Sequence, residues 1–114
     1  IKFPVTLIRL KVSELGIKSA TTLKTIYNLL ENNNFKLVDP LIAINSRFYY
    51  DEQPKGEWLR FAVPFNSMID SDGVPHLPKL GRGLGMYFLE TYWSYPDAIF
   101  HPHNEFVVQK NSDI

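Results

Sequence analysis

The hydrophobic positions in the first third of the chain follow two periods, one typical of a strand and one typical of a helix. Val5–Val12 alternates loosely between apolar and polar residues and predicts a β-strand. Residues Ser19–Thr22 can cap a helix, which we expect to continue to about Asn32. An apolar stripe at positions i, i+3, i+4 and i+7 supports this helix and consists of Leu23, Ile26, Tyr27 and Leu30.

The two segments that follow the helix predict a β-hairpin. Leu41–Tyr50 and Glu57–Phe65 are both rich in β-branched and aromatic residues, and the polar run Asp51–Gly56 separates them. The order strand, helix, hairpin places the helix on one face of a sheet. We expect the other face to be free and to carry the functional side chains.

The second half of the chain predicts strands without a second helix. Asn66–Lys79 is rich in Asp, Ser, Gly and Pro and predicts a loop, whereas Leu84–Trp93 predicts a strand. Ser94–Asn104 holds two prolines and is expected to be mostly irregular, and Glu105–Lys110 predicts a last short strand. Residues 1–114 should therefore form one α+β domain, with an antiparallel sheet built from strand–helix–hairpin units of which the second is abbreviated.

Composition and charge restrict the classes of function. Hydrophobic residues make up 45% and charged residues 21% of the chain, which is typical of a globular protein. Twelve basic and twelve acidic residues cancel and no basic stripe is present, so we expect no direct contact with nucleic acid. The absence of cysteine excludes disulfides, thiol catalysis and Cys-based zinc sites, and is compatible with a reducing compartment.

Targeting signals are not visible in the chain. No apolar run is long enough to span a bilayer and no signal peptide appears, so we expect a cytoplasmic protein without membrane contact. The first residue is Ile1 rather than Met, and we expect the chain to be part of a longer polypeptide or a trimmed one.

One carboxylate stands among aromatic rings in the strand of the second half. Because side chains alternate along a strand, Glu90 shares a face with Phe88 and Tyr92. A carboxylate between aromatic rings attracts organic cations through its charge and through the ring quadrupoles. The alternative is a Glu90 that is solvated, or that pairs with Arg47 or Arg60.

The predicted hairpin supplies two further candidates. Leu59, Phe61 and Val63 form its expected core face, which leaves Trp58 and Tyr49 for the other surface. Each aromatic residue taken singly is better explained by cross-strand packing. Only their clustering with Glu90 favours a ligand-binding role.

Other chemistry-bearing patterns are weak. His101, His103 and Glu105 occupy alternate positions, but Pro102 interrupts the run and no second cluster supports a metal site. The segment Asp70–Gly73 lacks the closing carboxylate of a calcium loop and predicts a turn. We therefore expect no metal and no cofactor, and no motif in the chain requires an enzyme.

Several segments resemble a known family. The segments TLIRLKV and TTLKTIYNLLENN, followed by YYDEQP before WLRFAVPF and later by LPKLGRGLGMYF, resemble the gyrase-inhibitor-like effector-binding domains. These domains sit at the C-terminal end of many bacterial transcription regulators of the MerR and AraC types, including multidrug sensors. The resemblance covers about residues 5 to 93, and its motifs are loose.

The resemblance implies a fold of two strand–helix–hairpin units with a ligand groove between them. It implies a small hydrophobic or cationic ligand held against aromatic residues and one acid from a strand of the second unit. By position that acid is Glu105, with Glu90 as the alternative. This chain departs from the family pattern because Ser94–Asn104 is too short and proline-rich for the second helix.

Three functions remain open from the sequence. The first is a ligand-sensing effector domain of a transcription regulator, with homodimer formation as a further expectation. The second is a protein-binding inhibitor module. The third is a hydrolase on the same fold, with Glu90 acting beside Tyr92 or Tyr87.

Overall fold

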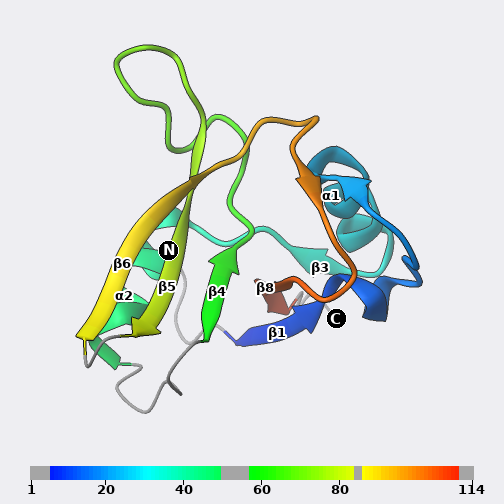
Figure 1. Cartoon of the computed structure of the whole chain (residues 1–114), viewed down its shortest axis with the longest axis horizontal. Helices are drawn as coiled ribbons and strands as arrows, with labels where there is room; N and C mark the ends of the chain where they lie inside the picture. The colour runs from blue at the N-terminus through cyan, green and yellow to red at the C-terminus, as the bar shows by residue number, and fades with distance from the viewer. Residues whose placement is uncertain (1–5, 50–56, 84–85, 111–114) are drawn as a thin grey trace.

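The computed structural model describes residues 6–49, 57–83 and 86–110. These residues form two helices, a short 3₁₀ helix and eight strands, which confirms the predicted α+β class (Figure 1). In chain order the elements are β1 (Leu7–Lys11), η1 (Val12–Leu15), β2 (Thr21–Thr22), α1 (Leu23–Asn32), β3 (Phe35–Lys36), α2 (Pro40–Tyr49), β4 (Trp58–Phe61), β5 (His76–Gly83), β6 (Met86–Trp93), β7 (Ile99–Phe100) and β8 (Glu105–Lys110).

The main sheet places the last strand of the chain near its centre. Its order is β1-β8-β4-β5-β6, with β3 also paired to β8, while β2 and β7 form a separate two-stranded sheet. Strands β4 and β8 are parallel, and the other pairs are antiparallel. Strand β8 has Phe106, Val107 and Val108 in succession, and all three are buried, because the strand is covered on both faces.

Helix α1 agrees with the sequence pattern. The backbone N–H of Thr25 donates to the side chain of Thr22, which caps the helix, and the predicted apolar stripe is buried. At the other end Asn34 adopts a left-handed conformation with φ of 65°. The predicted helix is therefore confirmed, with its first residue at Leu23.

The predicted hairpin of Leu41–Tyr50 and Glu57–Phe65 is wrong, because residues 41–49 of the first segment belong to helix α2. Asp39 accepts a hydrogen bond from the backbone N–H of Leu41 (2.8 Å), and Pro40 occupies the first helical turn, where its missing N–H costs nothing. This Asp-Pro pair is a helix start that outweighs the β-branched composition of the segment. The predicted polar turn Asp51–Gly56 lies outside the described residues.

The hairpin of the structure lies further along the chain. Strands β5 and β6 pair along their whole length, from His76 opposite Trp93 to Gly83 opposite Met86. The predicted loop Asn66–Lys79 is therefore wrong for residues 76–79, which belong to β5. Strands β1, β6 and β8 agree with the predicted strands within the described residues, and no described helix follows β4.

The two helices cover different parts of the sheet. Helix α2 lies behind β5 and β6 in Figure 1, and Ser46 of α2 lines a small cavity together with Leu59, Phe61 and Leu80 of the sheet. On the opposite face, the ring of Phe106 packs against Phe100 of β7, next to α1. The face of β4, β5 and β6 that is turned away from α2 carries no described helix.

No described helix combines the length and the apolar character needed to cross a bilayer.

The central position of β8 makes a prediction about stability. Phe106 is 2% exposed and its ring centroid lies 5.1 Å from that of Phe100, so Phe106→Ala should lower the free energy of unfolding by about 3–5 kcal/mol. Urea unfolding followed by tryptophan fluorescence measures this loss. As a control, Ile99→Ala in β7 should change it by less than about 0.5 kcal/mol, because Ile99 is 55% exposed. Equal losses in the two variants would contradict the described burial.

Candidate functional site

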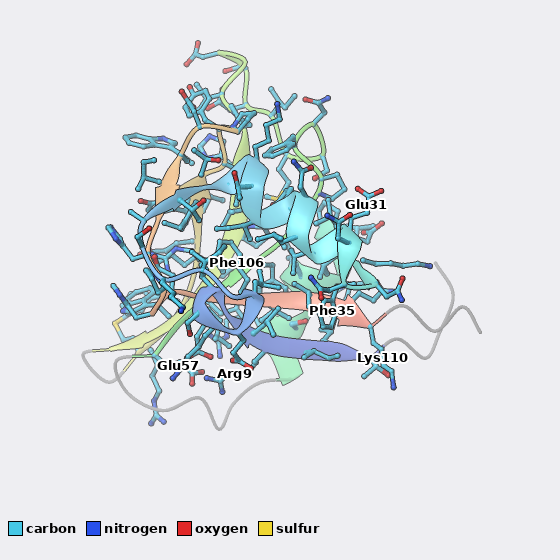
Figure 2. The ribbon with its side chains drawn as sticks, turned by 90° about the vertical axis from the view of Figure 1, so that its right-hand side faces the viewer. Arg9, Glu31, Phe35, Glu57, Phe106 and Lys110 are labelled. Atoms are coloured by element: carbon cyan, nitrogen blue, oxygen red, sulfur yellow. The ribbon has the colours of Figure 1, made fainter. Side chains whose placement is uncertain are left out.

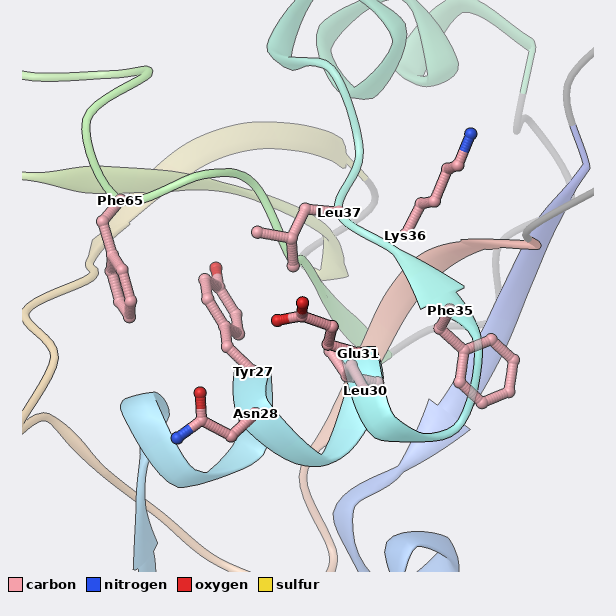
Figure 3. A pocket seen from close by; sticks show the side chains of 8 residues that line it. All are labelled: Tyr27, Asn28, Leu30, Glu31, Phe35, Lys36, Leu37 and Phe65. Atoms are coloured by element: carbon pink, nitrogen blue, oxygen red, sulfur yellow. The ribbon is translucent and has the colours of Figure 1, made fainter. Parts of the chain in front are cut away.

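A groove runs along the flank of α1, between that helix and the segments that follow β3 and β4 (Figure 3). Its volume is about 510 Å³, which lies in the range of small-molecule sites. We call it the α1 groove, and its lining residues are Tyr27, Asn28, Leu30, Glu31, Phe35, Lys36, Leu37 and Phe65.

Two aromatic rings form one wall of the α1 groove. The ring centroids of Tyr27 and Phe65 are 4.7 Å apart, and the Tyr27 hydroxyl donates a hydrogen bond of 2.7 Å to the backbone oxygen of Val63. Burial raises the pKa of the Tyr27 hydroxyl well above its usual value, so the phenol stays neutral. This hydrogen bond fixes α1 to the segment after β4 and holds the wall in place.

A carboxylate points into the same groove. Figure 3 shows the Glu31 side chain directed toward the space between Tyr27 and Leu37, whereas the amine of Lys36 is directed away from it. Glu31 follows Tyr27 by four residues, so the two side chains share one flank of α1. Within the described ranges, Glu31 forms no ion pair. The groove therefore places the exposed carboxylate of Glu31, which has no ion-pair partner among the described residues, beside aromatic walls.

The sheet face opposite α2 brings together four of the residues singled out in the sequence. Register aligns Trp58, Gly81 and Phe88 in one row across β4, β5 and β6. The next row is Arg60, Lys79 and Glu90. We call this surface the Trp58 face, and it consists of Trp58, Arg60, Lys79, Phe88, Glu90 and Tyr92.

The indole of Trp58 lies flat on the backbone of β5. A Cβ atom built on Gly81 would overlap the six-membered ring of the Trp58 indole. The rings of Trp58 and Phe88 are nearly parallel, with centroids 6.0 Å apart and an interplanar angle of 22°. Gly81 therefore creates the space in which the indole packs.

Two cations lie on the rings of the Trp58 face. The Lys79 amine is 4.6 Å from the Trp58 ring centroid, and the Arg60 guanidinium carbon is 5.0 Å from that of Tyr92. Burial lowers the pKa of Arg60. Burial and the charge of Arg60 lower the pKa of Lys79, which the charge of Glu90 partly offsets. Lys79 and Arg60 thus already lie against the rings on which the sequence predicts a bound cation.

The other two predicted site residues lie elsewhere. Glu105 accepts from Arg9 on the opposite face of the sheet, at 3.0 Å, and Arg9 also pairs with Glu57 at 2.7 Å (Figure 2). Tyr49 is the last residue of α2, and its side chain lies outside the described part of the chain. Glu90 and Glu105 therefore do not meet in one site, and Glu90 itself is exposed.

The remaining polar clusters have structural partners. Asp70 accepts from the backbone N–H groups of Asp72 and Val74, as expected for a turn, and its other oxygen lies 2.9 Å from Nε2 of His76. The imidazole rings of His101 and His103 stack with centroids 5.7 Å apart. Over the described ranges, no three His, Cys, Asp or Glu side chains gather in a way that could hold a metal ion.

Comparisons of the chain with protein-family models, with curated proteins and with solved structures find no match. The functional assignment therefore depends on the geometry of the chain itself.

The contact between Gly81 and Trp58 predicts the effect of one added methyl group. Gly81→Ala should displace the indole, lower the free energy of unfolding by about 1–3 kcal/mol and shift the Trp58 emission to longer wavelength. A Trp93→Phe background leaves Trp58 as the single tryptophan for this measurement. Gly83→Ala is the matched control, because nothing lies within 4 Å of the added Cβ. Identical emission from the two variants would contradict the packing of Trp58 on Gly81.

The Asp70–His76 contact predicts a pH-dependent contribution to stability. The hydrogen bond with His76 lowers the pKa of Asp70, so its stabilising effect is present above the ordinary carboxyl pKa and is lost as pH falls through the lowered value. Asp70→Asn keeps an acceptor for the turn but removes the charge. Its melting temperature should lie below that of the wild type at pH 6, and the gap should close on acidification below about pH 4.

Thermal unfolding of Asp72→Asn provides the control in the same turn. Only the backbone N–H of Asp72 binds Asp70, so this variant should show a smaller pH-dependent difference from the wild type. A constant gap between wild type and Asp70→Asn from pH 3 to pH 6 would refute the role of the ionised Asp70.

Proposed function

We propose that this domain binds a small organic cation in the α1 groove. The observation that carries this proposal is the Glu31 carboxylate, which projects beside the Tyr27–Phe65 wall without an ion pair among the described residues. A carboxylate next to aromatic faces attracts a cation through two additive electrostatic terms.

The shape of the groove suits a planar ligand of modest size. Leu30, Leu37 and Phe65 supply apolar surface, and the volume of about 510 Å³ can hold two or three fused rings. A ring stacked on this wall would bury apolar area, while Glu31 would fix the position of its charge. Hydrophobic cations would therefore bind better than neutral rings of the same shape.

Ligand binding in this groove would act on two parts of the chain at once. Tyr27 belongs to α1, Phe65 follows β4, and the Tyr27–Val63 hydrogen bond joins these segments. A ligand in contact with both would stabilise their present arrangement. This coupling would let the domain act as a ligand-sensing module, and the sequence resemblance outside the predicted hairpin implies that such a module serves a transcription regulator.

A matched pair of dyes tests the proposal. Proflavine is a planar cation at pH 7, and acridone is a neutral molecule with the same three-ring frame. Glu31→Gln should weaken proflavine binding about tenfold, because a charge-assisted contact is lost, and should leave acridone binding nearly unchanged. Fluorescence titration gives the two dissociation constants.

Glu90→Gln is the matched control for the loss of one carboxylate. It removes the same charge from the exposed strand β6, outside the α1 groove, and should leave proflavine affinity within about twofold of the wild type. The proposal fails if both Gln variants weaken proflavine equally, or if the wild type binds acridone as tightly as proflavine.

A further inference from the structure

The Trp58 face concentrates positive charge among aromatic rings. The Lys79 amine lies 4.6 Å from the Trp58 centroid and 5.4 Å from the Tyr92 centroid. The Arg60 guanidinium lies 5.0 Å from Tyr92 and 5.7 Å from the ring of Phe100. Two cations from neighbouring strands thus share one aromatic surface.

The positive charge of this surface is not neutralised at close range. In the part of the chain that the structure describes, neither Arg60 nor Lys79 forms an ion pair, and the buried Nε of Arg60 has no hydrogen-bond partner. Glu90 stands opposite Lys79 in the register and acts on it electrostatically, but its side chain is exposed. An anionic group placed beside Lys79 and Arg60 would therefore be stabilised by both positive charges.

The rings beside these cations provide a flat surface for stacking. Trp58 lies flat on Gly81, and Phe88 continues the surface with an interplanar angle of 22°. Both rings are partly exposed, and no described helix covers this part of the sheet. Aromatic ligands gain stacking and apolar burial on such a surface.

We propose that the Trp58 face binds a planar aromatic acid, with its ring against Trp58 and Phe88 and its anionic group beside Lys79 and Arg60. A carboxylate or a phosphate would meet the same requirement, since both accept hydrogen bonds from ammonium and guanidinium groups. This site is separate from the α1 groove and takes a ligand of opposite charge. A negatively charged ligand at this face is the opposite of the cation that Glu90 alone would attract.

Removing the Glu90 carboxylate should have opposite effects on a cation site and on an acid site. In a cation site, removing this carboxylate weakens binding. At the Trp58 face, Glu90 reduces the positive potential around Lys79, so Glu90→Gln should strengthen the binding of an acid by about two- to fivefold.

The experiment compares one ring with three substituents. We would titrate the Trp93→Phe protein, in which Trp58 is the single tryptophan, with 2-naphthoate, 2-naphthyl phosphate and neutral 2-naphthalenemethanol. Quenching of Trp58 fluorescence should show that at least one acid binds about tenfold more tightly than the alcohol. The tighter of the two acids identifies the preferred anionic group, and added NaCl should weaken it.

Charge-matched lysine variants locate the site. Lys79→Gln should weaken acid binding about tenfold, whereas Lys24→Gln removes the same charge from the exposed first turn of α1 and should have no effect. Lys79→Gln should also leave proflavine binding in the α1 groove unchanged, so the two proposals can fail separately. Equal effects of the two lysine variants, weaker acid binding by Glu90→Gln, or equal affinity for the acids and the alcohol would overturn the assignment.

Discussion

The two helices pack on opposite faces of the sheet and over different strands, and both candidate sites depend on this offset. Helix α2 covers the face of β5 and β6 that lies behind them in Figure 1, while α1 packs next to β3 and η1. The outer flank of α1 then borders the segments after β3 and β4, where the groove lies. The other face of β4, β5 and β6 keeps its aromatic and basic side chains accessible.

These two surfaces carry opposite charges although the chain as a whole is neutral, with twelve basic and twelve acidic residues. The α1 groove exposes the Glu31 carboxylate, and the Trp58 face holds Arg60 and Lys79. Net charge therefore says little about the ligands of this domain. The local arrangement of charged side chains decides which ligand each surface attracts, because interactions between charges weaken strongly over about 10 Å in salt solution.

The sequence predicts the parts of the fold that depend on local pattern. The apolar stripe of α1 correctly predicts a helix. The alternation of side chains along β6 correctly predicts that Phe88, Glu90 and Tyr92 share one face, and Trp58 lies on that face. Long-range register could not be predicted, so the sequence does not place Lys79 on the Trp58 ring, and it suggests Arg60 only as an ion-pair partner of Glu90 rather than as a cation on the Tyr92 ring. Two local features of the sequence do indicate parts of the structure: the Asp-Pro start of α2, and the i, i+4 spacing that places Glu31 beside Tyr27.

The late position of β8 in the chain has a consequence for synthesis. Its pairings join residues from opposite ends of the described sequence, such as Leu7 with Gln109, and it supplies the strand between β1 and β4. A nascent chain that has already produced β4, β5 and β6 still lacks the strand between β1 and β4, and the edge of β4 that pairs with β8 stays unpaired until Glu105–Lys110 emerges. Such high contact order slows folding, so this domain should complete its fold only at the end of translation of this segment.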